Sequence, residues 1–106
     1  MTDAHESVRA YVPHADADVV DKMAATYRLV LSSRDSSLVS ASDAEELKTV
    51  RENFLKKKLG LTHDDSDLDK AIAGVLDQMR DGKPNPRLAV YYLLAEKFDK
   101  LDMFRA

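Results

Sequence analysis

Arg51 is the side chain whose type and position best fit binding chemistry in this sequence. It lies in a helical stretch over residues 42–61, and at about 100° per residue it falls near the middle of the apolar side of that helix. A charge at such a position must be paired or must reach water. Arginine forms bidentate pairs with carboxylate or phosphate, so Arg51 is a candidate anion-binding residue. The alternative is that its aliphatic stem covers the core while its charged end reaches solvent.

The serine-rich segment 32–42 is the second candidate, because six of its eleven residues are serine. Arg34 beside Ser36 and Ser37 places a guanidinium group next to hydroxyls and turn amides, a mixture that can hold an anion or the backbone of a partner. The alternative is a turn that hydrogen-bonds to itself, which is typical of serine. If Arg51 points toward this segment, the two features form one binding site. We treat that conjunction as a hypothesis.

Neither a metal site nor a catalytic set is predicted. The run Asp65–Asp69 resembles the start of a calcium loop, but the sixth and twelfth positions hold Lys70 and Leu76 where glycine and glutamate are needed. We therefore interpret these aspartates as helix-capping residues. The three histidines lie far apart, without the close ligand spacing of zinc sites. We expect no cofactor, and we lean against an enzyme without excluding one.

Composition and charge are those of a folded protein with one domain over residues 1–106. Of the residues, 44% are apolar and 33% charged, the net charge is −3, and no segment forms a basic stripe, so nucleic-acid binding is the least favoured function. No apolar run approaches the ~20 residues of a membrane span. The acidic N-terminus does not resemble a signal peptide, and the absence of cysteine agrees with a reducing cytosol. We expect a cytoplasmic protein without membrane contact.

Apolar spacing predicts helices along the whole chain, and no stretch alternates with period two for long enough to form a strand. The expected helices cover residues 3–11, 16–31, 42–61, 64–81 and 86–103. The fold class that follows is all-α, a compact single-domain helical bundle of four main helices plus a short N-terminal helix.

Helix ends are also predicted from local chemistry. Asp16 should cap the second helix. Ser42 and Glu45 have the spacing of a capping box, and Gly60 should supply the left-handed residue that ends that helix. Asn85 should cap the last helix, with the following proline at its first position. The segment 32–42 is expected to be a loop with one helical turn over residues 36–40.

Two segments resemble a small family of uncharacterised bacterial proteins of about this length. They are SRDSSLVSASDAEELKTVRENFLKKKLGL (residues 33–61) and YYLLAEKF (residues 91–98). The resemblance implies a bacterial, cytoplasmic, stand-alone domain. It implies no reaction, cofactor or catalytic residue.

The leading functional prediction is a non-enzymatic helical module that binds another protein or a second copy of itself. Its support is the helix over residues 42–61, which is apolar over about half its circumference, since surplus apolar surface often marks an interface. The alternative is a protein that binds a small molecule or an anion through Arg51 and the serine-rich segment 32–42.

Overall fold

The computed structural model describes residues 8–28, 38–39, 43–79 and 85–104. The fold is all-α with one very short strand pair, which confirms the predicted fold class. Its elements in chain order are α2 (Ala17–Thr26), β1 (Leu38–Val39), α4 (Ala44–Thr49), the π-helix η1 (Val50–Lys58), α5 (Asp65–Gln78), β2 (Asn85–Pro86), α6 (Arg87–Lys97) and the 3₁₀-helix η2 (Leu101–Phe104).

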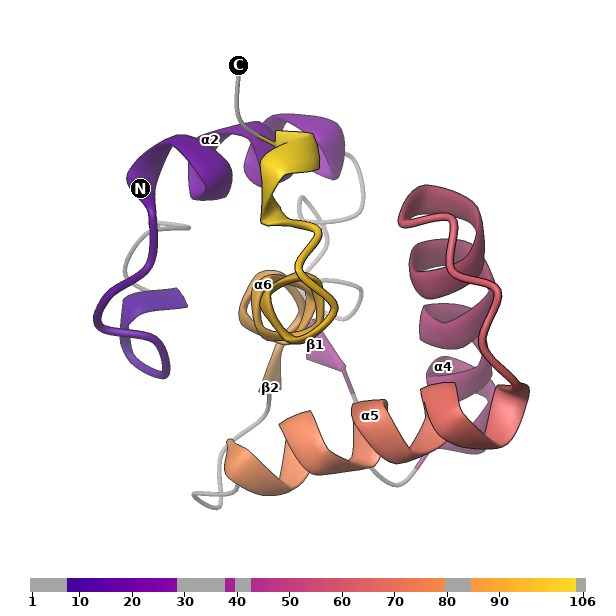
Figure 1. Cartoon of the computed structure of the whole chain (residues 1–106). Coiled ribbons are helices and arrows are strands. Elements are labelled where there is room, and N and C mark those ends of the chain that lie inside the picture. Colours follow the sequence, from indigo (N-terminus) through magenta and orange to yellow (C-terminus); the bar gives the residue numbers. More distant parts are fainter. Residues whose placement is uncertain (1–7, 29–37, 40–42, 80–84, 105–106) are drawn as a thin grey trace.

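Helix α6 is the centre of the fold. Every residue from Arg87 to Ala95 is buried, so this helix has no outward face over its first nine residues. Figure 1 looks along α6: α2 and η2 lie above it, the continuous α4–η1 helix lies to the right, and α5 lies below. A helix that is apolar all round must be enclosed, and the other helices enclose it.

Helix α2 is tied to α6 at its start. Asp16 is the N-cap, as predicted, and its carboxylate accepts a hydrogen bond from the backbone N–H of Asp18. The backbone N–H of Asp16 donates to the Tyr92 hydroxyl at 2.8 Å. Helix α2 ends at Thr26. The helix was predicted to extend to residue 31, but residues 29–31 lie outside the described part of the chain.

The helix predicted over residues 42–61 exists, but two of its details were wrong. Its N-cap is Asp43 instead of Ser42: the Asp43 carboxylate accepts from the backbone N–H groups of Glu45 and Glu46. From Val50 onward the helix is a π-helix, with hydrogen bonds from residue i+5 to residue i, so a spacing of 100° per residue no longer applies there. The predicted end is confirmed, because Gly60 has a φ of +70°.

Helix α5 follows its prediction closely. The apolar face expected from the sequence is buried in full; its members are Leu68, Ile72, Val75, Leu76 and Met79. The helix begins at Asp65 after the N-cap Asp64 and ends at Gln78, earlier than the predicted end at residue 81.

The strand pair β1–β2 was not predicted. Leu38 pairs with Pro86 and Val39 with Asn85 in antiparallel register, so residues 38–39 are extended and the predicted helical turn over residues 36–40 is wrong at these positions. Strands of two residues are too short to show a period-two pattern. Asn85 belongs to β2, and the N-cap of α6 is Pro86.

The last helix is shorter than predicted. It ends at Lys97, and Asp99 then adopts a φ of +59° before the chain enters η2. A left-handed residue breaks the helical path, and aspartate tolerates this conformation better than most residues. The buried apolar residues of the described segments form one cluster, to which η2 contributes Phe104.

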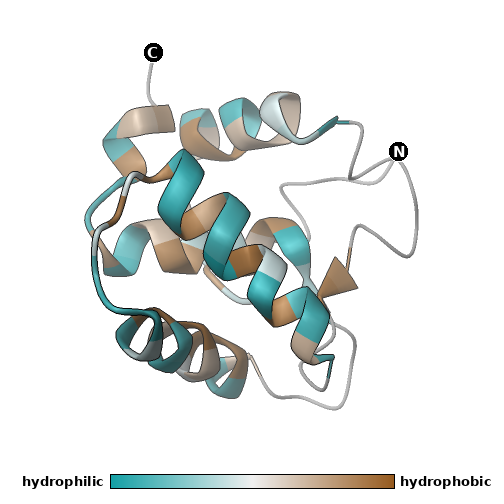
Figure 2. Cartoon of the chain, turned by 90° about the vertical axis from the view of Figure 1, so that its right-hand side faces the viewer, coloured by the Kyte–Doolittle hydropathy of each residue, from teal (hydrophilic) through white to brown (hydrophobic). Residues whose placement is uncertain are grey.

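Little apolar surface remains outside this core. Among the described residues, Met103 is the only large hydrophobic side chain that is exposed, at 43%. In Figure 2 the α4–η1 helix crosses the front, and most of its outward surface is hydrophilic. No helix in the described part of the chain combines the length and apolar character that crossing a membrane requires.

The two described glycines provide a matched test of this backbone. Gly74 lies inside α5, and a Cβ atom added there meets no atom within 4 Å, so Gly74→Ala should raise the free energy of unfolding by about 0.5–1 kcal/mol. Gly60→Ala should lower it by about 1–2 kcal/mol, since φ is positive there. Urea denaturation of both variants measures the difference; equal effects of the two substitutions would contradict the left-handed turn at Gly60.

Candidate functional site

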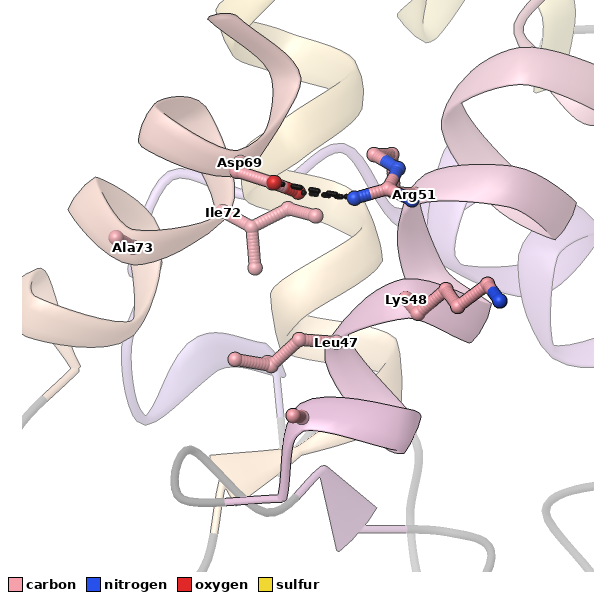
Figure 3. A pocket seen from close by; sticks show the side chains of 7 residues that line it. Leu47, Lys48, Arg51, Asp69, Ile72 and Ala73 are labelled. Atoms are coloured by element: carbon pink, nitrogen blue, oxygen red, sulfur yellow. Dashed lines mark hydrogen bonds and ion pairs between the residues drawn. The ribbon is translucent and has the colours of Figure 1, made fainter. Parts of the chain in front are cut away.

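A groove between α4 and α5 is the candidate binding site. It has a volume of about 410 Å³ and is lined by Ala44, Leu47, Lys48, Arg51, Asp69, Ile72 and Ala73. Figure 3 shows Leu47 and Ile72 pointing toward one another from the two helices, while the ammonium group of Lys48 points away from Asp69. The walls are therefore mainly apolar, with charged groups only at the edges.

Arg51 closes one end of this groove. One terminal nitrogen of its guanidinium group donates to both carboxylate oxygens of Asp69, at 3.1 Å each, and its Nε donates to Glu52 at 2.9 Å. The side chain is 16% exposed. Arg51 is thus paired with carboxylates of the same chain, and it also lines an open groove.

Arg51 belongs to a group of five charged side chains that we call the charge clasp: Arg51, Glu52 and Lys56 of η1, and Asp65 and Asp69 of α5. Lys56 contacts Asp65 at 2.5 Å and Glu52 at 3.0 Å, and the second terminal nitrogen of Arg51 lies 3.8 Å from Asp65. The clasp joins η1 to the first turns of α5 and carries a net charge of −1, as two cations face three carboxylates.

Contacts within the clasp favour the ionised forms of Arg51, Glu52, Lys56 and Asp65 by shifting the pKa of each. Hydrogen bonds from Arg51 and then Lys56 lower the pKa of Glu52, and the hydrogen bond from Lys56 lowers the pKa of Asp65. The same contacts raise the pKa of Lys56, chiefly through Asp65, and of Arg51, chiefly through Glu52. An incoming anion would therefore meet ionised carboxylates around Arg51.

The other predicted binding residues, Arg34, Ser36 and Ser37, lie outside the described residues. The partners that the structure gives Arg51 lie beside it on η1 and on α5. A shared site of Arg51 and the serine-rich segment stays a prediction.

Two of the histidines, His14 and His63, each contact a residue of α6 or its C-cap. His14 contacts Glu96 at 2.9 Å, and the His63 ring lies 5.2 Å from the Phe98 ring. Two members of the aspartate run, Asp65 and Asp69, bind the cations of the clasp. Within the described segments, no cluster of three or more histidine, aspartate or glutamate side chains is arranged to hold a metal ion.

Sequence reasoning missed a buried polar network at the start of α6. Arg87 is only 5% exposed; its guanidinium group donates to the Tyr91 hydroxyl at 3.1 Å, to the carboxylate of Glu46 and to the carbonyl of Leu38 at 3.4 Å. Burial alone would lower the pKa of Arg87, but Tyr91 and Glu46 more than offset it and raise the pKa above its ordinary value. The signal was present: Arg87 opens a run of eight uncharged residues, LAVYYLLA, which indicates a buried segment.

An aromatic cluster continues this network into the core. Phe54 of η1 stacks on Tyr91 with ring centroids 4.0 Å apart, and Tyr27 meets Tyr91 edge-on at 4.9 Å. Burial raises the pKa of both tyrosine hydroxyls, so they remain protonated at neutral pH. These groups hold α2, η1 and α6 together.

Comparison with protein families assigns the chain to a family. A family model described as a protein of unknown function, DUF2853, matches residues 3–102, almost the whole length. The chain belongs to this family. A comparison with curated proteins finds no match. The family membership confirms the resemblance to a family of uncharacterised proteins and assigns no activity, so any function must be argued from the geometry.

The Arg87 network generates a test of stability. Glu46→Gln leaves a buried guanidinium group without its carboxylate partner on α4, so we expect the free energy of unfolding to fall by about 2–3 kcal/mol. Glu45→Gln, at an exposed position one residue earlier, is the matched control and should change stability by less than about 0.5 kcal/mol. Equal stabilities of the two variants in chemical denaturation would show that the Glu46–Arg87 contact is dispensable.

Proposed function

We propose that the chain is a small protein-binding module, and that the groove between α4 and α5 receives one large apolar side chain of a partner. The observation that carries this proposal is the groove itself: about 410 Å³, with Leu47 and Ile72 on opposite walls. Its volume lies in the range of about 300–1,000 Å³ in which proteins bind ligand groups. Single anchors of this kind supply most of the binding energy of many interfaces.

The charged residues at the rim of the groove indicate which type of partner residue lies next to the apolar anchor. Lys48 lines the groove, is exposed, and forms no ion pair with a described residue. Arg51, in contrast, is engaged by carboxylates. We therefore propose a partner segment that carries an acidic residue next to its apolar anchor, with the acid facing Lys48.

The structure changes the basis of the interaction hypothesis. The apolar residues of η1 that suggested a surplus surface are buried inside the chain; they are Val50, Phe54 and Leu55, with Leu59 following. The width of the apolar arc therefore no longer supports an interface, and the groove supports the proposal in its place. Self-association is one way in which the groove could be filled, by an apolar side chain of a second copy.

The anion-binding alternative is less favoured by the geometry. An anion at Arg51 has to compete with Asp69 and Glu52, which already accept hydrogen bonds from its guanidinium group. We also infer a bacterial and cytoplasmic origin, supported by the resemblance of residues 33–61 to proteins of that kind and by the cysteine-free sequence.

The proposal is tested by selecting peptides from a display library on the immobilised chain. We expect enrichment of segments with one large apolar residue beside an acidic residue. Ala73→Leu fills the groove from an exposed position of α5 and should weaken the selected peptides at least tenfold in fluorescence anisotropy. Gln78→Leu, also exposed and on the same helix but outside the groove, is the control and should leave binding unchanged.

Two results would contradict the proposal. One is the absence of a shared sequence pattern among the selected peptides; the other is a pattern whose peptides bind Ala73→Leu as tightly as the original chain. Sedimentation velocity at increasing concentration separates a second copy from a foreign partner. A dimer that dissociates on Ala73→Leu substitution identifies the chain itself as the occupant.

A further inference from the structure

The continuous α4–η1 helix contains two patterns of backbone hydrogen bonds. We call them the α register, with bonds from residue i+4 to residue i, and the π register, with bonds from residue i+5 to residue i. Residues Ala44–Thr49 are α-helical and Val50–Lys58 form a π-helix of nine residues, whereas π-helix in proteins is mostly confined to single turns. The wide register persists to the end of the helix, where the N–H of Leu59 donates to the carbonyl of Phe54 at 2.9 Å. A long segment in a rarely used register needs a specific interaction that selects it.

The charge clasp is such an interaction, because it requires two cations five residues apart to face the same neighbour. Arg51 binds Asp69 and Lys56 binds Asp65, both on α5. In an α-helix, residues five apart point about 140° away from one another, so one of the two cations would turn away from α5. In a π-helix, whose hydrogen bonds run from residue i+5 to residue i, each turn holds more residues, so two cations five apart lie closer to one side of the helix. The two aspartates, four apart on an α-helix, are already on one side.

The core does not demand the π register. At α-helical spacing, the buried residues Val50, Phe54, Leu55 and Leu59 occupy about half of the circumference, an arc that a core-facing helix of ordinary geometry can bury. Gly60 follows the C-cap Leu59 with a φ of +70°, and glycine at this position can adopt other backbone angles at little cost. Packing thus permits both registers, whereas the charge clasp fits only one.

We propose that the charge clasp selects the π register of η1, and that η1 passes to the α register when the clasp is neutralised. In the α register Arg51 and Lys56 no longer face α5 together. Because the Arg51–Asp69 pair is also the end wall of the groove, the change of register alters the shape of that groove. The inference rests on the helix and the clasp alone, and it holds or fails independently of the proposed function.

Scalar couplings across hydrogen bonds, measured by NMR on the full chain, test this directly. At low salt the Leu59 amide nitrogen should couple to the Phe54 carbonyl carbon. In Lys56→Met we expect this coupling to be lost and a coupling from Leu59 to the carbonyl of Leu55 to replace it. The conservative variant Lys56→Arg keeps a positive charge between Asp65 and Glu52 and should keep the original coupling.

Lys57→Met is the matched control, because Lys57 is exposed and forms no ion pair with a described residue; it should keep the Leu59–Phe54 coupling. Salt gives a second test that needs no substitution: raising it from about 0.1 M to about 1 M shortens the screening length from about 10 Å to about 3 Å, and the original chain should then shift toward the Leu59–Leu55 pair. An unchanged Leu59–Phe54 coupling in both Lys56→Met and high salt would overturn the proposal. So would a Leu59–Leu55 coupling in the original chain at low salt.

Discussion

The need to bury a cation at the start of the central helix constrains the rest of this structure. Helix α6 is enclosed on all sides, so Arg87 at its first position is enclosed with it. A cation at a helix N-terminus is already opposed by the helix dipole, and burial adds a desolvation cost. Glu46 of α4, the Leu38 carbonyl of β1 and the Tyr91 hydroxyl together offset that cost. Segments far apart in the sequence are thereby held in one arrangement.

The groove follows from how the helices are joined. Glu46 attaches α4 to α6 through its contact with Arg87. The charge clasp attaches α5 to η1, the π-helix that continues α4. Among the described residues, Arg51 of η1 and Asp69 of α5 form the contact at one end of the groove (Figure 3). These polar contacts flank the mainly apolar groove between α4 and α5.

Local patterns in the sequence predicted the features that depend on neighbours along the chain. The buried face of α5, the Asp16 cap and the turn at Gly60 each arise from spacing or chemistry within one helix, so they could be read directly. The shift to a π-helix after Thr49 could not, because counting faces at 100° per residue assumes the register in advance. The short strand pair is also set by tertiary contact instead of a repeating pattern.

The ion-pair partners of the site residues were harder to predict from the sequence, because they lie on other helices. The position of Arg51 within an apolar arc correctly indicated that it needs a partner, but Asp69 lies eighteen residues away on another helix. Glu46 and Arg87 are forty-one residues apart. Periodicity shows that a buried charge needs a partner; only the packing of the helices decides which carboxylate supplies it.

Amide hydrogen exchange of the native protein tests most directly whether α6 is the centre on which the fold depends. If it is, the backbone amides of residues 90–94 exchange only through global unfolding, at the highest protection in the chain, and those of α2 and α5 exchange through smaller openings. Amides of α6 that exchange at lower free energy than those of α5 would show that the central helix opens on its own, and that the other helices do not depend on it.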